Sequence, residues 1–277
     1  MHFIQLGDYD KYEKIVYPAG EYQVRIKGYE GQIDRTNGFL EIEARISDMA
    51  QLIELGLLIS AAETCFYPIT VTLPYLPFGR ADRRFTPHDC DGLAFLSRYL
   101  FNCTTNLKVR SFDTHSVTAD TLGFDYMPPD DYLASIKATL GDDTILLCPD
   151  LGAANRYSGI GVKFKTTYFC SKKRDPITGK LLGFDVPVEI KENGPILLFD
   201  DICDGGGTFI GITEKLREAG IKNDLHLGVS HGIFSNGLDC LFQHFKTVHT
   251  TNSRTPSLSV LISDELHLYD YRTGRPL

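Results

Sequence analysis

Residues 196–208 of the chain read ILLFDDICDGGGT. Four apolar residues, typical of a buried strand, lead into Asp200 and Asp201, a third acid, three glycines and Thr208. Glycines let backbone N–H groups converge on an anion at a helix start, where the helix dipole adds to the attraction. Carboxylates repel phosphate, but they suit ribose hydroxyls, either directly or through Mg²⁺. The stretch therefore predicts a ribose-phosphate site, and the alternative is a sharp strand-to-helix turn with Asp as its cap.

Strands and helices are predicted to alternate along the rest of the chain. We expect short strands at 22–26, 39–46, 69–73, 107–112, 144–148, 166–170, 196–199, 225–229 and 246–249. The first two alternate apolar and polar residues, so they are predicted to be half-buried. We expect helices at 49–62 after the cap Asp48, at 88–101, at 128–140, and at 208–219 before Gly220, with a hairpin or loop over 175–194. This order predicts an α/β protein with mainly parallel sheets.

Length and composition limit the classes of function. At about 150 residues per domain, the 277 residues make slightly less than two domains, and the net charge of -8 argues against a protein built to grip nucleic acid. No apolar run reaches about 18 residues and the N-terminus lacks a signal-peptide pattern, so we expect no membrane segment and a cytoplasmic protein. The seven cysteines are scattered without a CxxC pair, which predicts reduced thiols and no zinc site.

Unusual residues recur where the predicted strands end. Ligands of open α/β sheets bind beyond the carboxyl ends of the strands. The segments at these ends are residues 74–84 (PYLPFGRADRR), 113–115 (DTH), 149–150 (PD) and 171–174 (SKKR). A basic run such as the last is most often a solvated loop, but its position after a strand end favours a function.

The quoted stretch resembles the loop shared by type I phosphoribosyltransferases and ribose-phosphate pyrophosphokinases. Further segments resemble the pyrophosphokinases in particular, and they are residues 74–84, 113–115, 148–152 (CPDLG), 172–174 (KKR) and 229–235 (VSHGIFS). The matches run in family order over most of the chain. The resemblance implies two tandem phosphoribosyltransferase-like domains, residues 1–142 on the ATP side and 143–277 on the ribose-phosphate side.

The family transfers the diphosphoryl group of ATP to the anomeric hydroxyl of ribose 5-phosphate, giving phosphoribosyl pyrophosphate (PRPP) and AMP, with Mg²⁺ as cofactor. Catalysis of such a transfer consists mostly of positioning and cationic clamping. The resemblance implies that Lys172 and Arg174 are catalytic. It implies ATP contacts by Tyr17, Glu21, Arg80, Asp82 and His115, and metal binding by His115, Asp150 and Asp200. It implies ribose-phosphate contacts by Asp200, Asp201, Asp204, Gly205, Gly206, Gly207 and Thr208. A homodimer or hexamer is implied as well, whereas His231 is expected to support the fold.

Three residues depart from the family pattern. Ala19 stands where the adenine-contacting motif has Asp, Ala81 where Gln follows the signature Arg, and Gly205 where the phosphate loop usually has Thr. These departures motivate a second acceptor, because some short, divergent members, notably in phages, pyrophosphorylate ADP-ribose in NAD rebuilding. Gly205 and the glycine run would leave room for the diester of ADP-ribose, and a phage-encoded protein would act in the host cytoplasm. Ribose 5-phosphate remains the favoured acceptor.

Two further alternatives belong to other classes. A non-catalytic subunit could keep the fold and associate with a true synthetase, but the motif residues Lys172, Arg174, His115, Asp150 and Asp200 are all present, which favours an enzyme. A plain phosphoribosyltransferase would need a base-binding hood, for which the sequence gives no candidate.

Overall fold

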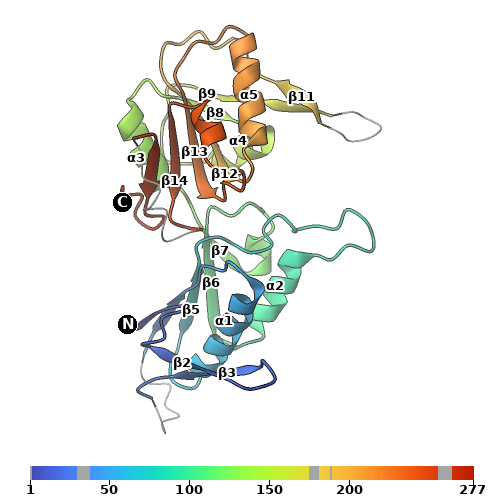
Figure 1. Cartoon of the computed structure of the whole chain (residues 1–277), viewed down its shortest axis with the longest axis vertical. Coiled ribbons are helices and arrows are strands. Elements are labelled where there is room, and N and C mark those ends of the chain that lie inside the picture. The colour runs from blue at the N-terminus through green and yellow to red at the C-terminus, as the bar shows by residue number, and fades with distance from the viewer. Residues whose placement is uncertain (1, 30–37, 175–180, 188, 255–263) are drawn as a thin grey trace. The chain divides into compact units, whose positions relative to one another are not determined.

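The structure is a computed structural model that describes residues 2–29, 38–174, 181–187, 189–254 and 264–277. For residues 172–174 and 181–182 it describes the backbone and not the side chains. The chain forms two compact units, Met1–Met127 and Pro128–Leu277 (Figure 1).

The N-terminal unit holds a five-stranded sheet in the order β1-β4-β5-β6-β7, and all its pairings are parallel. Its strands are β1 (His2–Gln5), β4 (Leu40–Glu43), β5 (Ile69–Leu73), β6 (Leu107–Phe112) and β7 (Phe124–Met127). A separate antiparallel hairpin consists of β2 (Tyr12–Val16) and β3 (Tyr22–Ile26), and the helices are α1 (Met49–Ala62), α2 (Gly92–Phe101) and the short 3₁₀ helix η2 (Asp120–Leu122). The predicted strands at 22–26, 69–73 and 107–112 are confirmed to the residue.

The core of this unit lies on one face of its sheet. Alternate residues of the strands point there, such as Ile42, Val71 and Val109, and they pack with the apolar faces of α1, α2 and the hairpin. The cap predicted for α1 is present, because the side chain of Asp48 accepts a hydrogen bond from the backbone N–H of Gln51.

The expectation that β4 is half-buried is wrong. All four of its residues are buried, including Glu41 and Glu43, which alternate with the core residues. Glu41 accepts hydrogen bonds from Nη2 of Arg110 at 2.8 Å and from Oγ1 of Thr72 at 3.2 Å, and Glu43 is paired with Arg45. Each of these buried carboxylates is paired with a guanidinium group, which compensates its negative charge.

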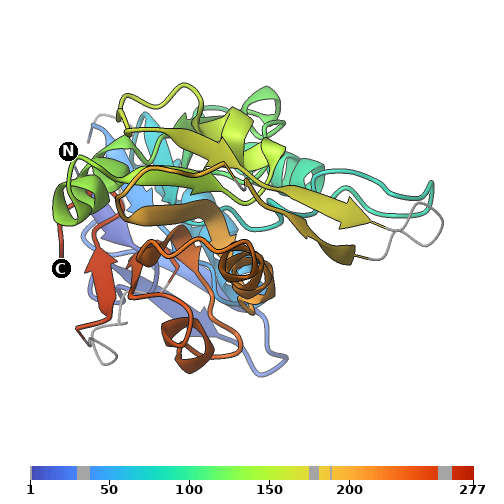
Figure 2. The same cartoon turned by 90° about the horizontal axis from the view of Figure 1, so that it is seen from above.

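The C-terminal unit holds a six-stranded parallel sheet in the order β15-β14-β13-β12-β8-β9. Its strands are β8 (Ile145–Cys148), β9 (Thr167–Phe169), β12 (Ile196–Cys203), β13 (Leu225–Gly232), β14 (Thr247–Thr251) and β15 (Leu266–Tyr269). A separate antiparallel hairpin is formed by β10 (Ser171–Arg174) and β11 (Leu181–Asp185), which confirms a hairpin in this region, and it extends beyond the sheet in Figure 2. The helices are α3 (Asp130–Leu140), α4 (Leu151–Tyr157), α5 (Gly207–Glu218) and α6 (Asp239–Phe242).

Helices cover both faces of the second sheet. Residues of α5 and α6, such as Phe209, Ile212 and Leu241, pack with the core residues of one face. On the other face the ring of Tyr132 from α3 contacts Phe199, and Tyr157 from α4 contacts the same ring. This sheet is therefore buried on both sides, as is usual for parallel strands.

The two units divide after Met127, whereas the resemblance placed the division at residue 142. Helix α3 accounts for the difference, because it belongs to the C-terminal unit. The hydroxyl of Tyr132 donates a hydrogen bond to the carbonyl of Val229, and the ring also contacts Tyr269. Pro128 and Pro129 therefore lie at the start of the second unit, directly before its first helix.

A row of histidines, of which His226 and His249 are buried, lies on the face covered by α3. His226, His249 and His267 come from neighbouring strands, and the rings of His249 and His267 stack at 4.7 Å. Burial lowers the pKa of His226 to about 4 and that of His249 to about 3. The neutral rings of His226 and His249 share hydrogen bonds with the hydroxyls of Thr247 and Tyr269.

These histidines predict loss of stability in mild acid. In the unfolded chain a histidine binds its proton near pH 6.5, while the buried rings stay neutral, so stability is full above about 6.5 and falls as pH drops toward 4. We expect the free energy of unfolding to lose about 1.4 kcal/mol per pH unit for each histidine in this window. Urea unfolding followed by circular dichroism at several pH values measures it. His249→Gln should show the shallower slope, and equal slopes for the two proteins would contradict this origin.

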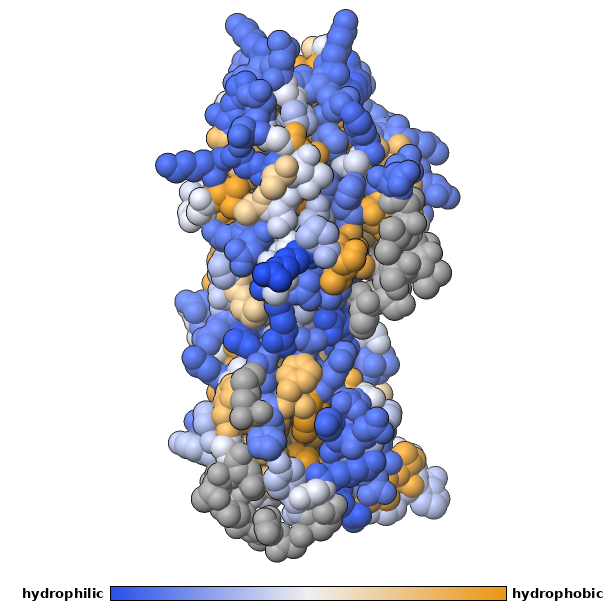
Figure 3. Space-filling model, turned by 90° about the vertical axis from the view of Figure 1, so that its left-hand side faces the viewer, coloured by the Kyte–Doolittle hydropathy of each residue, from blue (hydrophilic) through white to orange (hydrophobic). Residues whose placement is uncertain are grey.

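The surface and the thiols agree with the composition. The seven cysteines are free, and four of them are buried, Cys65, Cys148, Cys170 and Cys203. No helix among the described residues is long and apolar enough to cross a membrane. The face in Figure 3 is mostly hydrophilic, with hydrophobic residues in small separate patches.

Candidate active site

The strand order of the C-terminal unit reverses at β8. From β8 the chain goes to β9 on one side and to β12 on the other, so β8 and β12 are neighbours at the switch point. In open α/β sheets the crevice at the carboxyl ends of such strands is the usual ligand site. Asp150 follows β8 there, and Asp200 and Asp201 lie in β12.

The sequence predicted that Asp200 and Asp201 come after the strand, but in the structure both residues are part of it. β12 continues to Cys203 because it stays paired with β13 as far as Cys203 and Gly232. Successive strand residues point to opposite faces, so the two carboxylates differ in surroundings. Asp201 is buried, and Asp200 is half-buried.

Arg156 joins the two acids. It lies on α4, where its Nη1 atom is 2.7 Å from Oδ1 of Asp201 and 3.7 Å from Oδ1 of Asp200. Burial raises the pKa of Asp200 well above its ordinary value, the negative charge of Asp201 raises it further, and Arg156 opposes both effects. Two carboxylates thus share one guanidinium. A further cation near Asp200, the more exposed acid, would stabilise its charged form.

Asp150 caps α4, because its side chain accepts a hydrogen bond from the backbone N–H of Ala153 at 3.0 Å. Burial raises the pKa of the Cys148 thiol to about 12, and the charges of Asp200 and Asp150 raise it as well. Asp150 and Asp200 therefore both influence the pKa of the Cys148 thiol at the end of β8. Among the described residues, no three His, Cys, Asp or Glu side chains gather in the manner of a closed metal site.

The glycine run forms an open helix start. Gly206 is the N-cap of α5 with a φ of 81°, no side chain caps the helix, and its first turn has no acid. The helices α1, α2 and α4, in contrast, begin with Asp caps. The first backbone N–H groups of α5 are thus left for another acceptor, which suits an anion such as phosphate.

The segment after β13 lies against this loop. The backbone N–H of Ile233 and that of Phe234 donate to the carbonyl of Cys203, and that of Ser235 donates to the carbonyl of Asp204. His231 is buried and hydrogen-bonds to Ser253, in keeping with a structural role.

The surroundings of the glycine run differ along the side-chain direction. A Cβ atom at Gly205 would lie 2.7 Å from Nδ2 of Asn236. At Gly207, in contrast, a Cβ atom would meet nothing within 4 Å. The room for a diester at this loop stays a prediction.

The hairpin β10–β11 is attached to α5. A Cβ atom at Gly211 of α5 would lie 2.7 Å from the ring of Phe184, so this ring packs directly on the helix backbone. Phe184 is the backbone partner of Lys172 in the hairpin. The side chains of Lys172 and Arg174 lie outside what the structure describes, and their catalytic roles stay predictions.

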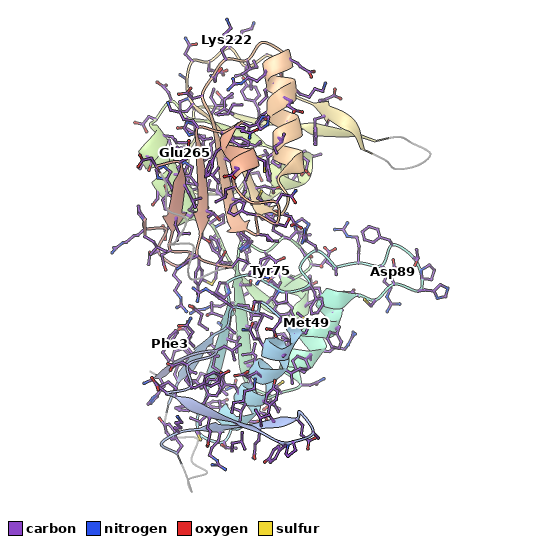
Figure 4. The ribbon with its side chains drawn as sticks, in the orientation of Figure 1. Phe3, Met49, Tyr75, Asp89, Lys222 and Glu265 are labelled. Atoms are coloured by element: carbon purple, nitrogen blue, oxygen red, sulfur yellow. The ribbon has the colours of Figure 1, made fainter. Side chains whose placement is uncertain are left out.

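In the N-terminal unit, the structure brings together the loops after β5 and β6. A Cβ atom at Gly79, next to Arg80, would lie 3.8 Å from Cβ of His115. The pKa of Asp82 is lowered by the hydrogen bond from Arg83, against the effect of burial, and also by one from Ser116. In Figure 4 Tyr75 marks the start of the first loop and Asp89 lies near its tip.

Backbone strain in the described residues falls on the predicted segments. The non-glycine residues with positive φ are Phe78 (61°), Asp113 (38°) and Phe234 (50°). Such conformations cost free energy and tend to persist where function requires them. Each of the three lies in a segment that the sequence had singled out.

Tyr17 and Glu21 lie apart from these loops in the sequence. Both are exposed on the turn of the hairpin β2–β3, where the hydroxyl of Tyr17 donates to the side-chain oxygen of Gln23 at 3.1 Å. Their contact with ATP stays a prediction.

Comparisons with known proteins agree with this geometry. No family model matches the chain. A ribose-phosphate pyrophosphokinase from Thermococcus kodakarensis is 27% identical over 233 residues, which cover 80% of this chain and 77% of that protein. One from Pyrococcus furiosus is 24% identical over 262 residues, which cover 90% and 88%. Over most of its length the chain is similar to ribose-phosphate pyrophosphokinases, from which it has diverged in sequence.

A solved structure has the same fold. The crystal structure of a phosphoribosylpyrophosphate synthetase from Mycobacterium smegmatis matches 98% of this chain and 95% of its own, with a TM-score of 0.72 and 19% identity. This likeness confirms the α/β fold class. The names of the curated relatives support an enzyme of the pyrophosphokinase type over the non-catalytic subunit.

The sequence analysis did not identify two residues of the candidate site, Arg156 and Asn236. Arg156 follows Asp150 by six residues on a helix, so a basic residue facing the acids could have been suspected. Asn236 directly follows the segment 229–235 that resembles the family, but its contact with Gly205 spans 31 residues and leaves no local pattern.

Proposed function

We propose that the chain transfers the diphosphoryl group of ATP to the anomeric hydroxyl of ribose 5-phosphate, giving PRPP and AMP. The observation that carries the proposal is the order of groups in β12 and α5. Paired acids at the switch point are followed directly by a helix start that no side chain caps. Acids suit the ribose hydroxyls and the open N–H groups suit the 5′-phosphate, so this order matches a phosphorylated ribose.

The roles of the residues follow from their surroundings. Asp200 and Asp201 would accept hydrogen bonds from the ribose hydroxyls, with Arg156 fixing the position of Asp201. Asp204 to Thr208 would surround the 5′-phosphate. Lys172 and Arg174 would place positive charge on the transferring group, and Arg80, Asp82, Tyr17 and Glu21 would contact ATP.

Mg²⁺ fits the acids of this site. Asp200 is a half-buried carboxylate that shares the guanidinium of Arg156 with Asp201, and Mg²⁺ commonly uses one or two carboxylates together with water and phosphate oxygens. Asp200 and Asp150 would bind a metal ion in the C-terminal unit, and His115 would bind one on the ATP side in the N-terminal unit. When bound, it would neutralise polyphosphate charge. Assembly into a homodimer or hexamer stays a prediction.

ADP-ribose is the second candidate acceptor, and the open side-chain direction at Gly207 is compatible with the bulk of its diester. The test is incubation of the purified protein with ATP, Mg²⁺ and either ribose 5-phosphate or ADP-ribose, with AMP release as the readout. We expect AMP with ribose 5-phosphate. AMP with ADP-ribose alone would transfer the proposal to that acceptor, and no AMP with either would refute diphosphoryl transfer.

A further inference from the structure

Asn236 and Gly205 form one contact at the rim of the proposed phosphate site. Nδ2 of Asn236 donates a hydrogen bond to the carbonyl of Gly205 at 3.1 Å. The backbone on either side is fixed as well, because Ser235 donates to the carbonyl of Asp204. The asparagine is exposed, so its amide lies at the surface beside the glycine run.

The missing side chain at position 205 is explained by Asn236 and not by the backbone. Gly206 needs a glycine because its φ is 81°, whereas Gly205 does not lie in the left-handed region. A Cβ atom at Gly205 would lie 2.7 Å from Nδ2 of Asn236 and 3.6 Å from Oγ of Ser235. The amide thus takes the space of a side chain at 205.

The position of this amide suits a ligand of the loop. One N–H of Nδ2 is held by the Gly205 carbonyl, and an amide nitrogen carries a second N–H. This second donor lies next to the helix start of α5, which no side chain caps. An anion held by the backbone N–H groups of the loop would find in it a further, neutral donor.

We propose that Asn236 is a specificity-determining residue of the acceptor site, whose amide donates a hydrogen bond to the phosphate ester at the 5′ end of the ribose. The inference rests on the proposed function for the identity of the acceptor. A hydrogen bond to a charged group is worth enough to change affinity by about ten- to a hundredfold. Asn236 therefore acts on acceptor binding and not on ATP.

The first test compares Asn236→Ala with the wild type. We expect KM for ribose 5-phosphate to rise about tenfold or more, with kcat and KM for ATP within about twofold. Asn236→Asp should raise KM further, because a carboxylate repels the phosphate. Asn193→Ala, at an exposed asparagine ahead of β12, is the matched control and should leave all three constants unchanged.

The second test is a double-mutant cycle. Gly205→Ala should weaken acceptor binding in the wild type, because the added Cβ displaces the amide of Asn236. In Asn236→Gly the same change has room and should have little further effect. Equal losses in the two backgrounds would overturn the structural link between the residues.

Calorimetric binding of ribose 5-phosphate separates this inference from the proposed function. If the wild type binds it without turnover and Asn236→Ala binds it more weakly, the inference holds and the proposed function fails. Equal binding by Asn236→Ala and the wild type, or no binding by the wild type, would overturn the inference.

Discussion

Replacing Lys172 by alanine is expected to lower turnover by about a hundred- to a thousandfold and to leave the thermal unfolding transition unchanged. The expected loss is that of removing one charged or hydrogen-bonding group aimed at the developing negative charge of a transition state. The backbone of Lys172 pairs with that of Phe184, and the ring of Phe184 packs on α5. We therefore expect the hairpin to keep its position without the lysine side chain. Initial rates of AMP release and the Tm of each variant measure the two effects.

Lys173 provides the matched control for this prediction. It lies next to Lys172 in β10 and carries the same charge, but the resemblance assigns it no catalytic role. Lys173→Ala should therefore keep turnover within about tenfold of the wild type. Near wild-type turnover of Lys172→Ala, or equal losses in both variants, would contradict the assigned role.

Arg156→Met is expected to lower the free energy of unfolding by about 3–5 kcal/mol. The change leaves Asp201 buried next to Asp200 with no guanidinium, and an uncompensated buried charge is costly. The side chains of Arg156 and Asp201 are 12% and 2% exposed, so solvent screens this ion pair only slightly. Urea unfolding of the wild type and the variant measures the loss.

Two further variants separate charge from shape. Arg156→Lys keeps the charge and loses the planar fork, so it should fall between the wild type and Arg156→Met. Arg156→Met combined with Asp201→Leu removes both charges and should regain most of the stability. A loss below about 1 kcal/mol in Arg156→Met would show that the pair does not stabilise the fold.

Local patterns predicted much of the fold. The cap Asp48, the apolar run before Asp200 and the glycines before α5 each act within a few residues, so their elements appear where the sequence placed them. Short edge strands such as β1 and β15 were missed, because four residues carry too little periodicity. The burial of Glu41 was missed as well, since it depends on Arg110, which lies 69 residues away.

The candidate site was predicted in part for the same reason. Acids and glycines at strand ends can be found in the sequence, and the strand order then confirms a switch point between β8 and β12. The contacts of Arg156 with Asp201 and of Asn236 with Gly205 arise only when separate segments meet. The packing of α3 on the second sheet is likewise a tertiary feature, and it places this helix in the second compact unit.

The group that moves is the central point of the proposed reaction. With ATP labelled at its β-phosphorus, Mg²⁺ and ribose 5-phosphate, one diphosphoryl transfer carries the label into the ribose product and leaves AMP unlabelled. We predict this outcome, with one AMP released for each labelled ribose diphosphate. Formation of ADP that retains the label would instead show transfer of a single phosphoryl group, and it would contradict the account.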